Sequence, residues 1–139
     1  MGRRKYHYKP QIFESAGVPN DTSANIYESM LTSPAFQHLT KNQRLLYVYM
    51  KAQYYGKRKP SQDFPEMSHL QGRDLFYFNR SIAVNKYGLY SDNNRKSFYD
   101  DIKAVEQHGF IKTISNGRAT RRKSIYQFSG DWRNWKGSS

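Results

Sequence analysis

The stretch GLYSDNNRKSFYDDIKAVEQHGF, residues 88–110, predicts a helix enclosed by two glycines. Serine is favoured at the N-cap of a helix, and glycine is favoured immediately after a helix ends. We therefore expect a tight turn over residues 88–90, followed by a helix that Ser91 caps. This helix is expected to run to about Gln107 and to stop at Gly109.

The two faces of this predicted helix differ in chemistry. Phe98, Ile102 and Val105 recur at spacings of four and three residues, which is the pattern of a stripe that faces a core. At about 100° per residue, Tyr99 falls on the flank of the helix. The positions opposite the stripe are polar: Asn93, Lys96, Asp100, Lys103 and Gln107.

A two-stranded hairpin is predicted after this helix. Residues 110–115 and 124–128 are apolar and β-prone, and Asn116-Gly117 is a turn signal. The connection between the two strands is too long for a two-residue turn, so we expect a looped-out tip. The cations of this tip are Arg118, Arg121, Arg122 and Lys123.

A core helix is predicted upstream. Thr40 is expected to cap a helix over residues 41–55, and Gly56 is expected to end it. Its apolar stripe is expected to consist of Leu45, Val48 or Tyr49, Ala52 and Tyr55.

The other segments are shorter. Residues 25–31 predict a short helix or an extended lead-in, and residues 34–39 predict a helical turn. A polar loop over residues 57–74 precedes a strand at residues 75–78 and a helix over residues 80–87, with Asn79 as its cap. Near the end of the sequence the two tryptophans are expected to pack back on the body: Trp132 and Trp135.

The order of these elements predicts an α+β fold, a winged helix-turn-helix with a helical core, a short strand and a C-terminal β-hairpin wing. In this fold the second helix of the pair enters a major groove, and the wing places cations near phosphates. Residues 26–139 are expected to form this single domain. Residues 1–25 predict a flexible basic arm, whose candidate DNA contacts are Arg3, Arg4 and Lys5.

The charge of the chain points to a polyanionic partner. The 139 residues include 23 Lys and Arg against 11 Asp and Glu, a net charge of +12, which favours nucleic acid over a membrane surface. Half of this net charge lies in residues 111–139. The chain has no cysteine and no long apolar segment, so we expect no disulfide, no association with a membrane and a cytoplasmic location.

The polar face of the second helix offers residue types that bind base edges. Asparagine can bind adenine, and arginine or lysine can bind guanine. The candidate DNA-binding residues on this helix are Asn93, Asn94, Arg95, Lys96, Tyr99 and Lys103. Those on the wing are Arg118, Arg121, Arg122 and Lys123. Asp100 either pairs with Lys96 at a spacing of four residues or accepts a hydrogen bond from cytosine.

No catalytic constellation is predicted. The four histidines are scattered, with no pair at metal-ligand spacing, and the chain has no phosphate-binding glycine motif and no nucleophile elbow. We therefore expect a non-enzymatic protein without cofactor or metal. One alternative is a winged-helix module that binds proteins. The other is a DNA-nicking enzyme that uses one of the 12 tyrosines.

Two segments carry a family resemblance: LTKNQRLLYVYM, residues 39–50, and SFYDDIKAVEQHGFI, residues 97–111. With them, residues 26–128 resemble winged-helix domains of Gram-positive plasmids, phages and conjugative elements, notably the N-terminal domain of plasmid replication initiators. The resemblance implies sequence-specific binding of double-stranded DNA through the second helix and the wing. It implies a role in replication initiation, or an accessory or transcription-regulating role, for a mobile element. Many winged helices bind as dimers, so the expected partners also include a second copy of the chain or other proteins of the element.

Overall fold

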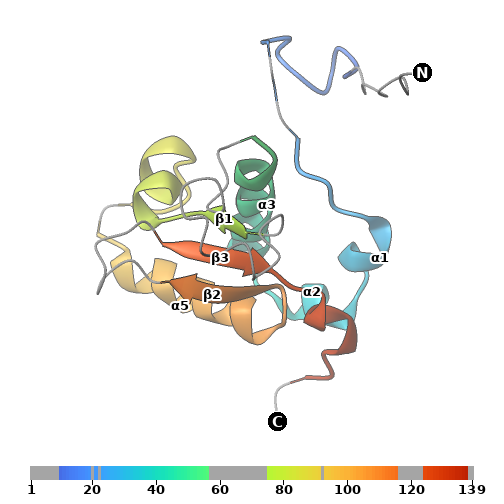
Figure 1. The fold of residues 1–139 in the computed structure, drawn as a ribbon, viewed down its shortest axis with the longest axis vertical. Helices are drawn as coiled ribbons and strands as arrows, with labels where there is room; N and C mark the ends of the chain where they lie inside the picture. Colours follow the sequence, from blue (N-terminus) through green and yellow to red (C-terminus); the bar gives the residue numbers. More distant parts are fainter. Residues whose placement is uncertain are drawn as a thin grey trace, which may run out of the picture.

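The chain has a mixed α+β fold with a small three-stranded antiparallel sheet (Figure 1). The computed structural model describes residues 10–19, 21, 23–56, 75–91, 93–115 and 124–137. Predictions for the 57–74 loop, for residues 1–9 of the arm and for the Asn116-Gly117 turn lie outside these residues. The elements in chain order are α1 (Glu28–Leu31), α2 (Pro34–His38), α3 (Lys41–Gly56), β1 (Leu75–Tyr77), η3 (Ile82–Lys86), α5 (Arg95–Gln107), β2 (Ile111–Ser115), β3 (Ile125–Phe128) and η4 (Asp131–Asn134).

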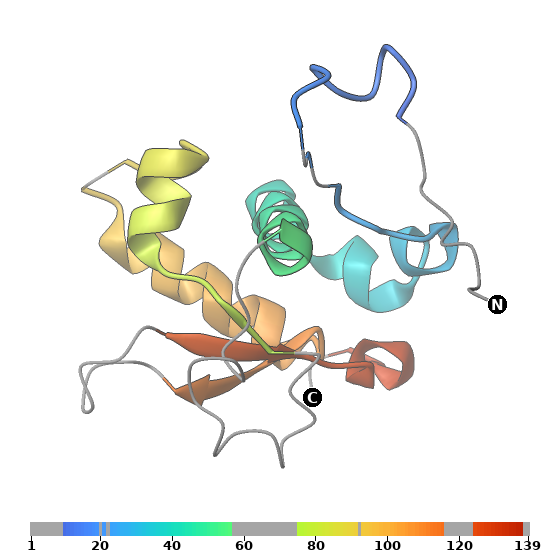
Figure 2. The ribbon, with the colours of Figure 1, turned by 45° about the horizontal axis from the view of Figure 1, so that its top comes forward.

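The sheet has the strand order β1-β3-β2, so β3 is its central strand. Tyr126 of β3 lies opposite Phe76 of β1 on one side and opposite Thr113 of β2 on the other. The register of β2 shifts between Thr113 and Ser115. Helices α3 and α5 lie on the same side of the sheet (Figure 2). The predicted hairpin strands are therefore confirmed as antiparallel neighbours, and residues 116–123 connect them.

The start of α3 is fixed by a reciprocal cap. The Thr40 hydroxyl accepts from the backbone N–H of Gln43 at 3.2 Å, and the Gln43 side chain accepts from the backbone N–H of Thr40 at 2.9 Å. This confirms Thr40 as the cap. One turn later, Arg44 donates to the carbonyl oxygens of Phe36, Gln37 and Leu39. Its guanidinium thus satisfies backbone acceptors where α2 ends.

The buried face of α3 differs from the predicted stripe. Leu46, Tyr47, Met50 and Gln53 are buried, whereas Leu45 is 44% exposed. The stripe is therefore rotated by about one residue. The reason is that the ring of Tyr47 packs against Phe110 and other aromatic side chains of the core, with ring centroids 5.1 Å apart for this pair. A pattern search that counts only apolar residues as core residues misses Tyr47, because a tyrosine ring can be buried although its hydroxyl is polar.

The helical segment after β1 is a π-helix over Ile82–Lys86 rather than the expected α-helix. Asn79 caps it as predicted, because its side-chain oxygen accepts from the backbone N–H of Ile82 at 2.8 Å. The backbone N–H of Tyr87 donates to Ile82, five residues earlier, which is the hydrogen bond of a π-turn. Gly88 then takes a positive φ of 65° and ends the segment.

Helix α5 begins later than predicted. It starts at Arg95 with Asn94 as its N-cap residue, so the assignment of Ser91 as the cap is wrong. The physical reason is a preceding turn, in which the backbone N–H of Asn94 donates to the carbonyl of Ser91 at 3.0 Å. The predicted core stripe is confirmed, since Phe98, Ile102 and Val105 are all buried.

The end of α5 is a Schellman motif. The N–H of Phe110 donates to the carbonyl of Val105, and the N–H of Gly109 donates to that of Glu106. Gly109 has a φ of +89°, a conformation that L side chains rarely adopt. Its carbonyl accepts from the backbone N–H of Trp132 at 3.0 Å. The predicted stop is confirmed, and it also joins α5 to the segment after β3.

Candidate nucleic-acid interface

The predicted helix residues are exposed and gather around the first half of α5. Asn93 and Asn94 lie just before the helix, and the four others lie within it: Arg95, Lys96, Tyr99 and Lys103. The candidate residues of the arm and of the β2–β3 connection lie outside the described part of the chain: Arg3, Arg4, Lys5, Arg118, Arg121, Arg122 and Lys123.

One side of α5 combines an aromatic ring with cations. At about 100° per residue, Arg95, Tyr99 and Lys103 fall on the same flank as Glu106. The Glu106 carboxylate accepts from the backbone N–H and the hydroxyl of Thr113 in β2, both at 3.2 Å. This flank of α5 therefore faces β2. The Glu106 carboxylate, which is the acidic group of this flank, is hydrogen-bonded to β2.

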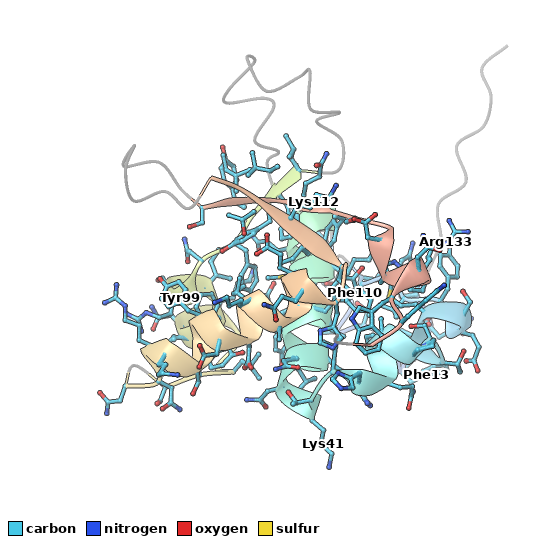
Figure 3. The ribbon with its side chains drawn as sticks, turned by 90° about the horizontal axis from the view of Figure 1, so that it is seen from below. Phe13, Lys41, Tyr99, Phe110, Lys112 and Arg133 are labelled. Carbon is cyan, nitrogen blue, oxygen red and sulfur yellow. The ribbon has the colours of Figure 1, made fainter. Side chains whose placement is uncertain are left out.

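Tyr99 is held in place on this flank (Figure 3). Its ring meets the buried ring of Phe98 edge to face, with centroids 5.0 Å apart, yet 44% of the residue is exposed. The guanidinium carbon of Arg95 lies 6.0 Å from the centre of the Tyr99 ring, within the range of a cation–π contact. Burial and then the nearby Tyr99 raise the pKa of Tyr126, in β3, to about 12.

The outermost edge of α5 carries an ion pair. Lys96 Nζ lies 2.8 Å from Asp100 Oδ2, and both side chains are largely exposed. The hydrogen bond to Asp100 raises the pKa of Lys96. Of the two roles considered for Asp100, the structure shows the pairing with Lys96.

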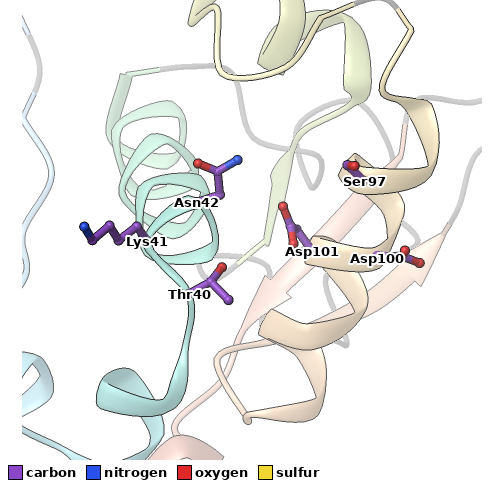
Figure 4. A pocket seen from close by; sticks show the side chains of 6 residues that line it. All are labelled: Thr40, Lys41, Asn42, Ser97, Asp100 and Asp101. Atoms are coloured by element: carbon purple, nitrogen blue, oxygen red, sulfur yellow. The ribbon is translucent and has the colours of Figure 1, made fainter.

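The opposite flank of α5 is acidic and faces the start of α3. A groove of about 540 Å³ separates the start of α3 from the first half of α5 (Figure 4). It is lined by Thr40, Lys41, Asn42, Ser97, Asp100 and Asp101. Two carboxylates here disfavour a phosphate, so the two flanks of α5 differ in the partner that they can accept.

Asp101 braces α5 against its neighbours. One carboxylate oxygen accepts from the hydroxyl of Tyr90 at 2.6 Å, and the other accepts from the Gln43 side chain at 3.1 Å. Burial, followed by the hydrogen bond to Asp101, raises the pKa of Tyr90. Asp101 thus ties α5 both to the cap of α3 and to the turn before α5. Gln43 and Tyr90 were not among the predicted site residues; only the T-x-x-Q pattern of the cap is visible in the sequence.

The first expected result concerns this brace. Asp101→Asn should lower the free energy of unfolding by roughly 1–2 kcal/mol, because an amide offers one acceptor oxygen where two donors converge. Urea unfolding followed by tryptophan fluorescence measures the loss. Asp100→Asn is the matched control, since its pair with Lys96 is exposed, and its unfolding midpoint should stay close to that of the wild type. Equal losses in both variants would contradict a bracing role.

The β2–β3 connection departs from the same side of the molecule as the start of α5. The end of β2 and the beginning of β3 lie at the same end of the molecule as the start of α5 in both views (Figures 1 and 2). This connection, residues 116–123, contains four cations and no acid.

Two histidines that are far apart in sequence meet at the other end of α5. His38 Nδ1 lies 2.8 Å from His108 Nε2. The His108 ring stacks on Trp135, and the His38 ring packs against the same tryptophan in a tilted arrangement. The description of the histidines as scattered therefore fails for this pair. The pair is separated by 70 residues, so no sequence spacing could have found it. Trp132 stacks on Phe110, and both tryptophans pack on the core as predicted.

Within the described ranges, no group of three or more histidine, cysteine or acidic side chains could hold a metal ion. The same residues contain no helix with the length and apolar character needed to cross a bilayer. A comparison with known proteins found no matching family model, no matching curated relative and no matching solved structure. The function is therefore inferred from the geometry of α5 and its surroundings.

Proposed function

We propose that this protein is a non-enzymatic winged helix-turn-helix protein that binds duplex DNA sequence-specifically. In this proposal η3 and α5 form the helix pair, and β2 and β3 form the wing. The element order and the strand order β1-β3-β2 support it. The observation that carries it is the cationic flank of α5, with Arg95, Tyr99 and Lys103. The sequence that joins β2 to β3, residues 116–123, adds four cations and no acid.

The chemistry of this surface suits a groove and its phosphates. An α-helix fits the major groove of B-DNA, where the first turns of α5 would bring Asn93, Asn94 and Arg95 to base edges. The connection would lie beside the helix and place Arg118, Arg121, Arg122 and Lys123 near phosphates or a minor groove. Lys96 would exchange Asp100 for a phosphate or a base when DNA binds.

The biological setting belongs to the same proposal. The resemblance of residues 26–128 to initiator domains of mobile elements supports action at a plasmid origin or as an accessory or regulatory factor. Selection of bound sites from random duplexes would supply the preferred sequence. A site that recurs in an origin region would favour replication, whereas a site in a promoter would favour transcription regulation.

The decisive experiment is a titration of labelled duplex DNA at several salt concentrations. Log affinity is expected to fall linearly with log salt, by about 0.9 for each phosphate that is neutralised. The double variant R121A/R122A should bind more weakly to all sequences, with a slope smaller by roughly one unit per lost phosphate contact.

Three results would contradict the proposal. A salt-independent affinity, or no binding to duplex DNA, would favour the protein-binding module instead. Nicked product from supercoiled DNA in the presence of Mg²⁺ would favour the nicking enzyme. Unchanged affinity of R121A/R122A would remove the wing from the interface and leave α5 as the only contact.

A further inference from the structure

The exposed apolar side chains of the described residues are concentrated before α3. Seven large hydrophobic residues are exposed, and five of them lie within residues 12–31. Ile12 is 98% exposed and Phe13 is 86% exposed. Exposed apolar side chains that gather on one segment, rather than being scattered singly, are a feature of interaction surfaces.

A local turn holds these two side chains outward. The backbone N–H of Gln11 donates to the Glu14 carboxylate at 2.7 Å, and the N–H of Glu14 donates to the carbonyl of Gln11 at 2.9 Å. Ile12 and Phe13 occupy the two central positions between these bonds. The turn thus orders the pair before any partner arrives, which reduces the entropy lost on binding.

The segment that runs from this turn to the start of α3 carries the opposite charge to the rest of the chain. Residues 10–40 contain Glu14, Asp21 and Glu28 and no lysine or arginine, whereas the remaining residues carry a net charge of +15. This segment is therefore a poor surface for DNA. Its partner should offer apolar area together with positive charge.

The body of the same chain has such a surface on α3. Leu45 is 44% exposed, and Lys41 lies one turn before it on the same helix face and is also exposed. Ile12, Phe13 and Leu45 are all exposed in a single chain, so the chain does not cover one of these surfaces with the other. A second copy can cover both.

We propose that two copies of the chain exchange these surfaces. Ile12 and Phe13 of each copy pack on Leu45 of the other, and Glu14 lies near Lys41 of the other. Because each copy gives and receives the same contact, the assembly closes as a two-fold dimer. This inference does not depend on DNA binding. If the proposed function also holds, the dimer presents two copies of α5, and an inverted repeat is the expected DNA site.

Sedimentation velocity of the full chain without DNA tests the proposal. The wild type is expected to show a reversible monomer–dimer equilibrium. I12S/F13S should raise the dimer dissociation constant by at least about 100-fold, because four large apolar side chains lose their burial per dimer. Leu45→Ser should also weaken the dimer. Val18→Ser is the matched control, since Val18 is an exposed apolar residue of the same segment but lies outside the turn, and it should leave the equilibrium unchanged.

Charge variants test the pairing of the two surfaces. Lys41→Glu places an acid opposite an acid and should weaken the dimer at low salt, whereas adding salt should narrow the difference from the wild type. Glu14→Gln keeps the acceptor oxygen of the turn, and it should relieve the defect of Lys41→Glu when the two changes are combined. Circular dichroism and urea unfolding verify that each variant is folded.

A monomer at every concentration tested would overturn the proposal, as would a dimer that I12S/F13S leaves intact. Binding of a different protein by a chain that is monomeric alone would overturn it as well. Failure of DNA binding in a chain that still dimerises through this surface would contradict only the proposed function.

Discussion

Gly109→Ala is expected to lower the free energy of unfolding by roughly 3 kcal/mol or more, because two costs add. The φ of +89° strains any L residue. In addition, a Cβ at this position would lie 2.6 Å from the backbone nitrogen of Trp132 and 2.7 Å from the carbonyl carbon of Asp131. These are backbone atoms, so the clash cannot be relieved by rotation of a side chain.

Gly88→Ala is the matched control that measures the cost of backbone strain without the cost of a steric clash. Gly88 also has a positive φ, of 65°, but a Cβ there would have no neighbour within 4 Å. Backbone strain alone should cost roughly 1 kcal/mol. Urea unfolding of both variants, followed by tryptophan fluorescence, gives the difference. Similar losses at the two positions would mean that the segment around Trp132 moves away at little cost.

This glycine matters for the candidate site because it joins α5 to β2. The hydrogen bonds of the Schellman motif end the helix, and the bond from Trp132 to Gly109 anchors η4 against the same point. The angle between α5 and the sheet is therefore fixed by backbone contacts. If the proposed function holds, a change here should disturb DNA binding through the fold, whereas changes on the α5 flank should act on binding alone.

The parts of the fold that depend on local chemistry could be predicted from the sequence. The stripe of Phe98, Ile102 and Val105, the caps at Thr40 and Asn79 and the stop at Gly109 all depend on residues within one or two turns. The start of α5 was misplaced because Ser91 and Asn94 are both good cap residues, and a turn between them decides which one precedes the helix. The rotation of α3 depends on aromatic partners distant in sequence, such as Phe110, which no local pattern contains.

The candidate site also has a part that could be predicted from local sequence and a part that could not. The exposed positions on α5 follow from helical periodicity, so their residues could be named in advance. The network of Asp101 with Gln43 and Tyr90 could not be predicted, because Gln43 is separated from Asp101 by 58 residues. The contact of His38 with His108 has the same origin. Long-range pairs are set by how α2, α3 and α5 pack, and this is decided by the core rather than by any motif.

Arg95→Ala is expected to have the largest effect on DNA recognition. If its guanidinium binds one guanine with two hydrogen bonds, the variant should lose ~1–3 kcal/mol at one base position, which is about 5- to 150-fold in affinity. Arg95 is suited to this role because it lies in the first turn of α5, is exposed and lies over the ring of Tyr99 at 6.0 Å. A guanidinium that rests on a ring keeps the donors in its plane free for a base edge.

Two matched variants separate base recognition from charge. Arg95→Lys keeps the charge but loses the planar pair of donors, so it should retain affinity for random duplexes and lose preference at the same base position. Lys103→Ala, two turns further along α5, should weaken all sequences alike if it contacts phosphate. Competition between the selected site and its single-base variants measures these differences. An equal loss on all sequences for Arg95→Ala would assign this residue to phosphate, and no loss at all would exclude the first turn of α5 from the interface.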